Sequence, residues 1–299
     1  MENFKSGFVT IIGRTNVGKS TLINKLVGQK IAIITSKPQT TRTAIKAIIN
    51  RENSQIIFTD TPGIHRPKNK LGKLMLETSY SSAKDVDVIV FLIEATEEGI
   101  GKGDSRIIEK IKEMNRPTIL LINKIDLIKK EDILNVIENY KDTYDFKAII
   151  PISAEKNEGL NLIIDEIEKL LPNGPKYYLD DEFTDQAVRQ IVEETIREKA
   201  LKLLDKEVPH GIFVEMEKMN KKKTQQNEDY YNIEATIYCA RNSHKSIVIG
   251  KNGEMLKKIG TYARQDIERL VDMKVNLQLW VKVKEDWQDT DNILNRFKI

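Results

Sequence analysis

The chain of 299 residues contains a single cysteine and no CxxC pair. One cysteine cannot build an internal disulfide framework, and without cysteine pairs the sequence shows no sign of a zinc site of that kind. Cys239 lies inside the apolar-rich stretch IEATIYCA, so we expect it to be a core residue and not a nucleophile.

The sequence also lacks a long hydrophobic run. Its longest apolar run, VIVFLIEA, is far shorter than the roughly 20 residues that a transmembrane helix needs. The first residues, MENFKSGF, lack the apolar core of a signal peptide. Hydrophobic residues at 40% and charged residues at 31% are ordinary for a soluble protein. We therefore expect a cytoplasmic, soluble protein.

The formal net charge of only +3 conceals an uneven distribution. Residues 172–240 contain 10 Lys and Arg against 14 Asp and Glu. Residues 241–284 contain 10 Lys and Arg against 4 Asp and Glu, a local excess of +6. Such a basic segment is typical of a nucleic-acid surface, although charge alone does not establish one.

Strand-like and helix-like segments alternate in the first part of the chain. The apolar runs are GFVTII, QIIFTD, DVIVFLIEA, TILLIN and KAIIPIS, and amphipathic stretches such as SRIIEKIKEM separate them. This pattern predicts an α/β domain, with a mostly parallel sheet and helices on both faces. The segment TAIKAIINRENSQIIFTD reads as two strands joined by a turn, which predicts one antiparallel edge strand.

The second part of the chain follows a proline- and glycine-containing stretch, LPNGPKYYLDDE, which is typical of a linker. We predict a first domain over residues 1–172, a linker over 173–182 and a second domain over 183–299. The second domain has the predicted order helix, strand, strand, helix, helix, strand, and is therefore of the α+β class. The segment KSIVI fits either a short strand or a helix.

A phosphate-binding motif lies between the first predicted strand and the first predicted helix. The stretch GRTNVGKST fits the pattern G-x-x-x-x-G-K-[ST]. In such loops backbone N–H groups surround phosphate oxygens, the lysine reaches the β- and γ-phosphates, and the hydroxyl binds Mg²⁺. The nucleotide-binding residues predicted here are Gly13, Asn16, Val17, Gly18, Lys19, Ser20 and Thr21.

Three further motifs follow predicted strands and identify the nucleotide as GTP or GDP. In DTPG, Asp60 is placed to hold Mg²⁺ and Gly63 to donate its N–H to the γ-phosphate. In NKID, Asp126 can accept hydrogen bonds from the N1 and N2 groups of guanine, which adenine lacks. The third motif, Ser153-Ala154, follows IIPI and is placed to donate a backbone N–H to guanine O6. Asn123 and Lys124 complete the predicted nucleotide contacts. All four motifs occur at strand ends, where open α/β sheets bind ligands.

The stretch ITSKPQTTRT lies where a mobile loop would bring a threonine to the metal. We assign this role to Thr41, with Thr40 as the alternative, so that Ser20, Thr41 and Asp60 form the predicted metal site. The four motifs resemble those of translation-factor-class GTPases, and QTTR is similar to the switch of the Era family of bacterial GTPases. The resemblance predicts a P-loop GTPase domain.

The resemblance also bears on the chemistry of hydrolysis. Ile64 stands where Ras-type GTPases have a glutamine that orients water, and the resemblance implies slow intrinsic hydrolysis. His65 is an alternative base, although an exposed loop histidine explains it as well. For Asn16 two roles stay open, binding a K⁺ ion that supplies charge or shaping the loop. The predicted catalytic residues are Lys19, Thr41, Gly63 and Asn16.

A second glycine pair, in VIGKNGEML, lies inside the basic segment. KH domains use a G-x-x-G loop to admit a nucleic-acid backbone, and the order of elements resembles the type II KH arrangement. HKSIVIGKNGEMLKKIG also resembles the Era signature in this domain. The predicted RNA-binding residues are Ile249, Gly250, Lys251, Asn252, Gly253 and Lys257. Ile247 and Ile259 are further candidates for a base-binding groove, unless they belong to the core.

The resemblance to the Era family covers essentially the whole chain. It implies a monomer that binds 16S ribosomal RNA near its 3′ end and assists maturation of the 30S subunit, with Mg²⁺ as cofactor. It also implies a peripheral location at the inner face of the cell membrane as an alternative to a purely cytoplasmic one. A signalling GTPase whose second domain binds protein or membrane is the alternative from a different class, but the predicted helix TDQAVRQIVEETIREKALKLL carries mixed charges, unlike a membrane-surface helix.

Overall fold

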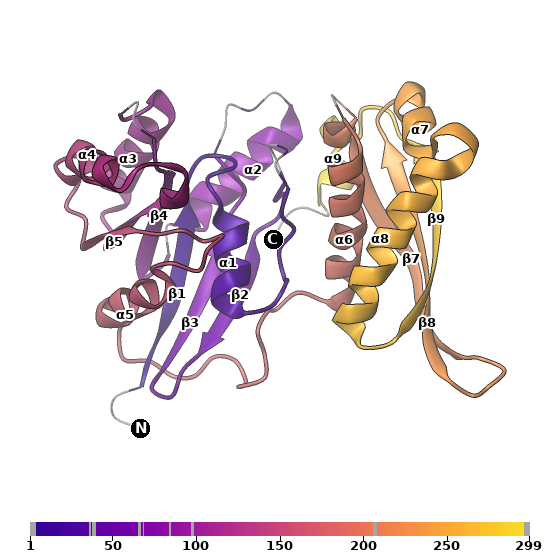
Figure 1. The fold of residues 1–299 in the computed structure, drawn as a ribbon, viewed down its shortest axis with the longest axis horizontal. Helices are drawn as coiled ribbons and strands as arrows, with labels where there is room; N and C mark the ends of the chain where they lie inside the picture. The colour runs from indigo at the N-terminus through magenta and orange to yellow at the C-terminus, as the bar shows by residue number, and fades with distance from the viewer. Residues whose placement is uncertain are drawn as a thin grey trace. The chain divides into compact units, whose positions relative to one another are not determined.

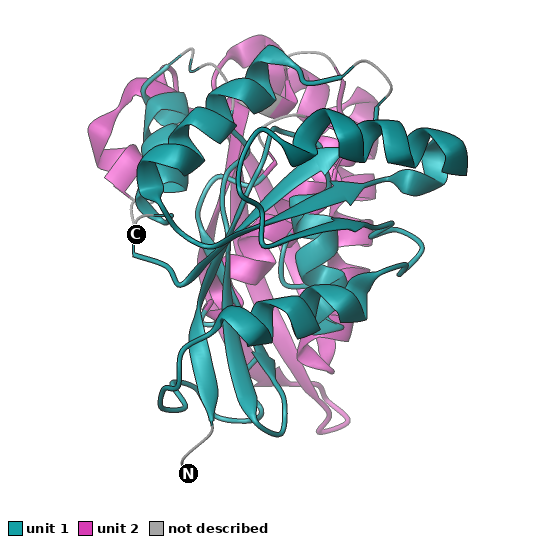
Figure 2. Cartoon of the chain, turned by 90° about the vertical axis from the view of Figure 1, so that its left-hand side faces the viewer, with its two compact units in different colours: residues 1–32, 41–185, 297–299 teal, residues 33–40, 186–296 magenta. Residues whose placement is uncertain are grey.

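The structure is a computed structural model that describes residues 4–295 except 36, 38–39, 65–66, 68, 84, 97–98 and 206–207. Two compact units can be distinguished by their internal contacts (Figure 2). Residues 4–32 and 41–185 form the first unit, and residues 33–40 and 186–295 form the second. Among the described residues, none of the helices combines the length and the apolar character that crossing a membrane requires.

A six-stranded sheet with the order β2-β3-β1-β4-β5-β6 forms the centre of the first unit (Figure 1). Its strands are β1 (Lys5–Ile12), β2 (Ile45–Asn50), β3 (Ser54–Asp60), β4 (Val88–Glu94), β5 (Thr118–Asn123) and β6 (Ala148–Pro151). Strand β2 pairs antiparallel with β3, and the other neighbouring strands pair in parallel. The predicted mostly parallel sheet with an antiparallel edge is confirmed.

Helices cover both faces of this sheet. They are α1 (Lys19–Val27), α2 (Lys70–Ser81), α3 (Lys102–Met114), α4 (Lys130–Lys141) and α5 (Leu160–Leu170). Alternate residues of β5 enter two different cores, because side chains of a strand point to opposite faces. Ile119 and Leu121 join the core that contains residues of α1 and α5, whereas Leu120 and Ile122 join the core that contains residues of α3 and α4.

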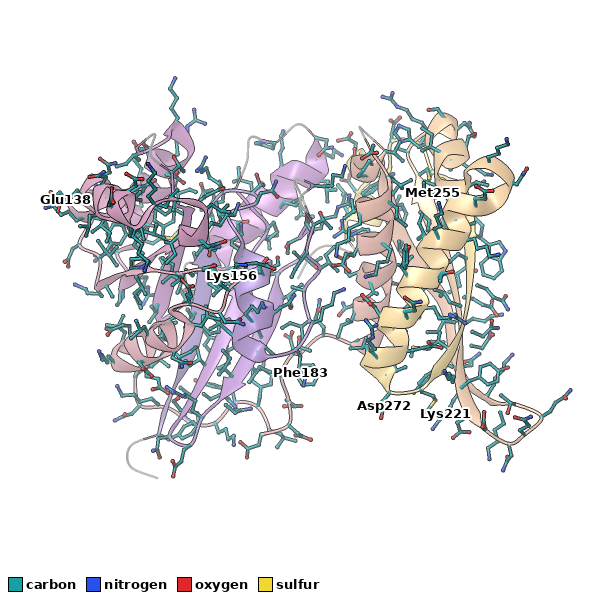
Figure 3. The ribbon with its side chains drawn as sticks, viewed as in Figure 1. Glu138, Lys156, Phe183, Lys221, Met255 and Asp272 are labelled. Atoms are coloured by element: carbon teal, nitrogen blue, oxygen red, sulfur yellow. The ribbon has the colours of Figure 1, made fainter. Side chains whose placement is uncertain are left out.

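The segment that follows α5 forms hydrogen bonds with strands of the first unit. Gln55 is fully buried, and its Oε1 accepts the backbone N–H groups of Tyr177 and Tyr178, at 2.7 and 3.0 Å. The backbone N–H of Ile48 in β2 donates to the carbonyl of Phe183 at 3.0 Å, which covers part of the edge of that strand (Figure 3). Residues 173–182, predicted as a linker, therefore belong to the first unit by their contacts.

The second unit contains a three-stranded sheet with helices on one face. Its strands are β7 (Ile212–Lys223), β8 (Asp229–Cys239) and β9 (Lys274–Val283), and its helices are α6 (Val188–Leu203), α7 (Asn242–Ile249), α8 (Glu254–Val271) and α9 (Asp291–Leu294). Strand β8 is central, antiparallel to β7 and parallel to β9. Val192 and Ile196 of α6 and Ile259 and Ala263 of α8 share one core with the strands. The predicted order of elements is confirmed, with KSIVI as part of α7.

Short 3-10 helices complete the two units. They are η1 (Ile125–Leu127), η2 (Pro209–Gly211), η3 (Lys251–Gly253) and η4 (Trp287–Asp289). Two of them, η1 and η3, contain residues of the predicted binding motifs.

Candidate functional site

The phosphate loop, residues 13–18, joins β1 to α1. A Cβ at Gly13 would lie 2.3 Å from the carbonyl oxygen of Leu92. Gly18 has a φ of +104°, and a Cβ there would lie 2.3 Å from Nδ2 of Asn123. Both positions therefore require glycine. Gly18 leads directly into α1, whose first N–H groups have no partner within the helix and favour an anion.

Lys19 places its ammonium inside this loop. Its side chain is buried, and Nζ donates to the carbonyl oxygens of Gly13 and Arg14 at 3.1 and 2.8 Å. Burial lowers the pKa of Lys19 to about 8, and the nearby Asp60 carboxylate partly opposes this effect. A buried ammonium with few counter-charges favours an anionic ligand.

Three oxygen-bearing side chains meet beside the loop. The Ser20 hydroxyl donates to Oδ2 of Asp60 at 2.8 Å, and its Oγ lies 2.9 Å from Oγ1 of Thr41. Thr40, the alternative, directs its hydroxyl to the carbonyl of Lys37 at 2.6 Å. The structure thus brings together Ser20, Thr41 and Asp60, the three residues predicted as the metal site.

The DTPG motif packs directly on the phosphate loop. A Cβ at Gly63 would lie 2.8 Å from the Cα of Thr15, so the two backbones touch. The N–H of Ile64 donates to the carbonyl of Gly13 at 3.2 Å. Ile64 is thus held beside the loop and offers no polar side-chain group there. His65 lies outside the described residues.

The NKID motif has two separate roles in the structure. Asn123, at the end of β5, donates to the carbonyl of Val17 at 2.7 Å and accepts the N–H of Ala154 at 3.0 Å. Asn123 therefore ties the phosphate loop to the 153–154 loop. The backbone N–H of Ala154, a candidate donor to guanine O6, is bonded to Asn123 in this structure. Lys124 forms an ion pair with Glu94, at 2.9 Å.

Asp126 lies on the exposed side of this arrangement. It is exposed, and its Oδ1 accepts the hydroxyl of the fully buried Ser153 at 2.6 Å. This bond fixes the carboxylate next to the 153–154 loop. A bound base would bury the Asp126 carboxylate, and a base without donors at this edge would leave the carboxylate unpaired.

The G-x-x-G loop connects α7 to α8 in the second unit. Gly250 has a φ of +72°, and a Cβ there would lie 2.7 Å from the Cβ of Met255. Gly253 has a φ of +79°, but a Cβ there would meet nothing within 4 Å. Gly250 is therefore required by packing and Gly253 by conformation. Lys251 and Asn252 between them are exposed.

A groove of about 490 Å³ begins at this loop and runs between α8 and β9. Lys257 and Arg264 of α8 and Asn276 of β9 line it. Strand β9 pairs with β8 and, among the strands of the second unit that the structure describes, stands at the edge of the sheet. The groove thus combines two cations with backbone groups of a strand edge.

Comparison with known proteins identifies both parts of the chain. Residues 8–124 match the family described as "50S ribosome-binding GTPase", and residues 207–288 match the KH domain family. The GTPase Era of Clostridium kluyveri is 53% identical over 290 residues, covering 97% of each chain. The GTPase Era of Clostridioides difficile is 50% identical over 295 residues, covering 98% of each. The chain belongs to the Era family of GTPases.

Solved Era structures resemble this Era-family chain over nearly its full length. One is Era in complex with MgGDPNP and nucleotides 1506–1542 of 16S ribosomal RNA, with a TM-score of 0.93, 41% identity and 98% of each chain covered. Another is a single-residue variant of Aquifex aeolicus Era bound to GDP·AlF4⁻, with a TM-score of 0.93 and 40% identity, covering 98% of this chain and 99% of that one. The type II KH fold and the P-loop fold predicted for this Era-family protein are both confirmed.

The residues of the metal site fit Mg²⁺. Oδ1 of Asp60 is buried and has no hydrogen-bond partner among the described residues, which is costly unless a cation or donor binds there. Burial raises the pKa of Asp60 to about 6, opposed by Lys19 and by hydrogen bonds from Ser20 and Thr41. No group of three or more His, Cys, Asp or Glu side chains in the described part of the chain could hold a metal. Phosphate and water oxygens would therefore complete the coordination, as is usual for Mg²⁺.

Two residues of the groove are absent from the predicted RNA-binding set, and one groove candidate belongs to the core. Arg264 and Asn276 line the groove, and only their position after a G-x-x-G loop could have suggested them. Ile259 is fully buried in the core of the second unit. Ile247 is 49% exposed, and Ile249 is partly buried.

Proposed function

We propose that this protein hydrolyses GTP and binds the 3′ region of 16S ribosomal RNA during assembly of the 30S subunit. The observation that carries the proposal is the full-length likeness to an Era protein solved with MgGDPNP and nucleotides 1506–1542 of 16S ribosomal RNA. The phosphate loop, the Ser20–Thr41–Asp60 cluster and the basic groove support it. We assign GTP binding to residues 1–185 and RNA binding to the part of the second unit that begins at residue 186.

Each site residue then has a distinct role. Lys19 and the N–H groups of the phosphate loop would hold the β- and γ-phosphates, and Gly63 would donate its N–H to the γ-phosphate. Ser20, Thr41 and Asp60 would hold Mg²⁺, which neutralises charge on the phosphate oxygens when bound. Because Ile64 cannot orient water, we expect slow intrinsic hydrolysis. Asn123 keeps the two loops together, and Asp126 would bind the guanine edge.

RNA binding would rest on the second unit. The G-x-x-G loop would let the phosphate backbone approach where Gly253 has open space, and Lys251, Lys257 and Arg264 would supply positive charge. Single-stranded RNA in such a groove is held by its backbone near the loop and by its bases along the groove. A filter-binding assay with the 3′-terminal sequence of 16S ribosomal RNA and a scrambled RNA of equal length tests this proposal. Equal retention of the two RNAs would contradict it.

Replacement of Lys251 by alanine is expected to change the salt dependence of RNA binding. If Lys251 contacts one phosphate, its loss reduces the slope of log affinity against log salt by about 0.7 for single-stranded RNA. The measurement is RNA affinity at several KCl concentrations. Lys258→Ala is the matched control, because Lys258 is an exposed lysine of α8 outside the residues that line the groove. Identical slopes for wild type and Lys251→Ala would remove Lys251 from the interface.

The role of Asn16 can be tested by changing the cation. Asn16 is exposed and has a φ of +66°, a conformation that asparagine tolerates, so loop shaping and K⁺ binding both fit. If it helps to hold K⁺, hydrolysis is expected to be about tenfold faster in K⁺ than in Na⁺ at equal ionic strength, the effect of one charged contact. Asn16→Ala would abolish the difference, and Asn16→Gly would also do so while preserving the backbone conformation. Equal wild-type rates in both salts leave Asn16 with loop shaping alone.

A monomeric state and peripheral membrane association, which the family resemblance implies, stay predictions. Sedimentation of the purified protein, and co-sedimentation with anionic lipid vesicles, would test them.

A further inference from the structure

The side chain of Arg14, the second residue of the phosphate loop, is held by a buried carboxylate of α3. Nε of Arg14 donates to Oδ1 of Asp104 at 3.0 Å. The side chain of Asp104 is 2% exposed, and that of Arg14 is 38% exposed. A Cβ at Gly103 would lie 2.7 Å from Cδ of Arg14, so the arginine lies directly on the first turn of α3. These residues all belong to the first unit.

The other oxygen of the Asp104 carboxylate is also bonded within the first unit. The hydroxyl of Tyr140 in α4 donates to Oδ2 of Asp104 at 3.2 Å, and Tyr140 is 3% exposed. Helices α3 and α4 contribute to one core on the same face of the sheet (Figure 1). Because each oxygen of Asp104 has a partner, the carboxylate cannot turn away from Arg14 without losing a buried hydrogen bond, which is costly.

The backbone of Arg14 belongs to the nucleotide site. Its carbonyl oxygen accepts Nζ of Lys19 at 2.8 Å, and the residue forms a parallel β-bridge with Ile64, directly after the DTPG motif. The side chain and the carbonyl of Arg14 are joined at one Cα, so a rotation of the loop that moved the carbonyl would also pull the guanidinium away from Asp104. Only a few side-chain rotamers are available to compensate for such a rotation. The buried carboxylate therefore restrains the carbonyl that Lys19 contacts.

Stability alone is a weak explanation for this buried charge. Burial raises the pKa of Asp104, and the charge of Arg14 and the hydrogen bonds from Tyr140 and Arg14 oppose this effect only in part. Buried ion pairs often stabilise a fold no more than apolar residues of similar size would, and their best-supported role is to fix one arrangement among several. The arrangement that Asp104 fixes is the one in which the ammonium of Lys19 lies inside the phosphate loop.

We infer that Arg14 and Asp104 are positioning residues of the nucleotide site, which hold the phosphate loop in the shape that presents Lys19 to the phosphates. This inference rests on the phosphate role proposed for Lys19. Because GTP and GDP both carry the β-phosphate, loss of the ion pair weakens the binding of both nucleotides. Linkage requires the reverse effect as well, so that a bound nucleotide stabilises the contact between Arg14 and Asp104.

Affinities of the full-length protein for GDP and for a non-hydrolysable GTP analogue, measured by displacement of a fluorescent GDP, test this inference. In Asp104→Ala both affinities are expected to fall about tenfold, the effect of one charge-assisted hydrogen bond. Asp104→Asn restores part of the affinity, because its side-chain oxygen can still accept Nε of Arg14. The double variant Arg14→Ala/Asp104→Ala is expected to bind no more weakly than the weaker of the two single variants, since all three lose the same contact.

Glu109→Ala is the matched control, since Glu109 is an exposed acidic residue of the same helix. An ion pair that only stabilises the first unit would lower the melting temperature of Asp104→Ala without changing the nucleotide affinity of the folded protein. Wild-type affinities in Asp104→Ala, alongside an impaired Lys19→Ala, overturn the positioning role alone. Wild-type affinities in Lys19→Ala overturn the phosphate role and the positioning role together.

If Asp104→Ala does not fold, nuclear magnetic resonance of the wild-type protein decides. The Nε–H signal of Arg14, assigned by its loss in Arg14→Lys, reports directly on the bond to Asp104. Adding GDP to the nucleotide-free protein is expected to slow the exchange of this proton with water, because the bound nucleotide stabilises the contact. An exchange rate that GDP leaves unchanged would overturn the inference.

Discussion

Asp126→Asn is expected to change the base preference of the nucleotide site from guanine to xanthine. The Asp126 carboxylate would accept two hydrogen bonds from the N1 and N2 groups of guanine, and an asparagine offers one acceptor and one donor. The donor would face the N2 amino group of guanine, but in xanthine an oxygen occupies that position. Two charge-assisted bonds contribute about 3 kcal/mol or more, so GTP affinity is expected to fall at least about 100-fold.

The structure makes this substitution a clean test. An asparagine at this position would still accept the hydroxyl of Ser153 through its side-chain oxygen, so the loop geometry at 2.6 Å does not depend on the charge. Affinities for GTP and for xanthosine triphosphate, measured by competition with a fluorescent GDP, give the result. Asp142→Asn also removes one negative charge, at an exposed position at the end of α4, and is the control for the loss of charge alone. Unchanged GTP affinity in Asp126→Asn would mean that the guanine site is elsewhere.

The nucleotide site could be predicted from the sequence to a large extent, because its motifs follow strands that meet at one edge of the sheet. Each of these motifs is a short continuous stretch of sequence. Its glycines, such as Gly13 and Gly18, mark the positions where the backbone leaves no room for a side chain. The contacts of Asn123 with Val17 and Ala154 could not be predicted, because they join positions 106 and 31 residues apart. Contacts between residues so far apart in the sequence depend on how three loops pack against one another.

The division into units was harder to predict. The prolines and the glycine of residues 172–175 indicate a break in regular structure, but they do not say whether the chain leaves the domain. Here the buried Gln55 binds the backbone of Tyr177 and Tyr178, and a single glutamine in a strand gives no sign of that role. Residues 33–40 belong to the second unit by their tertiary contacts, one of which joins the N–H of Ile34 to Glu198, and the sequence gives no sign of such contacts.

In the second unit, the periodicity of apolar residues predicts the helices and strands, but it does not show which apolar residues point into the core. Ile259 follows the G-x-x-G loop as closely as a groove residue would, yet it is buried in the core. The four-residue spacing of Ile259, Ala263 and Ile267, all buried, is the pattern of a core-facing stripe. Arg264, one position after Ala263 in this stripe, lines the groove instead.

Gly253→Asp is expected to abolish RNA binding while leaving nucleotide affinity unchanged. A Cβ at Gly253 meets nothing within 4 Å, so the carboxylate projects into the space where phosphate would lie. Like charges forced together at an interface cost several kcal/mol, which is a loss of at least about 100-fold in affinity. Gly253→Asn is the matched control, since asparagine has the same shape and tolerates a positive φ but carries no charge. A substitution at Gly250 would be a poorer probe, because its Cβ would collide with Met255.

The same measurement tests whether the nucleotide controls RNA binding. The γ-phosphate and Mg²⁺ are expected to order the region around Thr41 and Gly63, and such a local change can alter a distant site. We expect RNA to bind more tightly with a non-hydrolysable GTP analogue than with GDP, by a factor of about five to 150. Linkage then requires RNA to favour GTP over GDP by the same factor. RNA affinity is measured in both nucleotides for wild type, Gly253→Asp and Gly253→Asn. Equal RNA affinities of the wild-type protein with GDP and with the GTP analogue would show that the nucleotide does not regulate RNA binding. Wild-type RNA binding by Gly253→Asp would place the RNA away from the G-x-x-G loop.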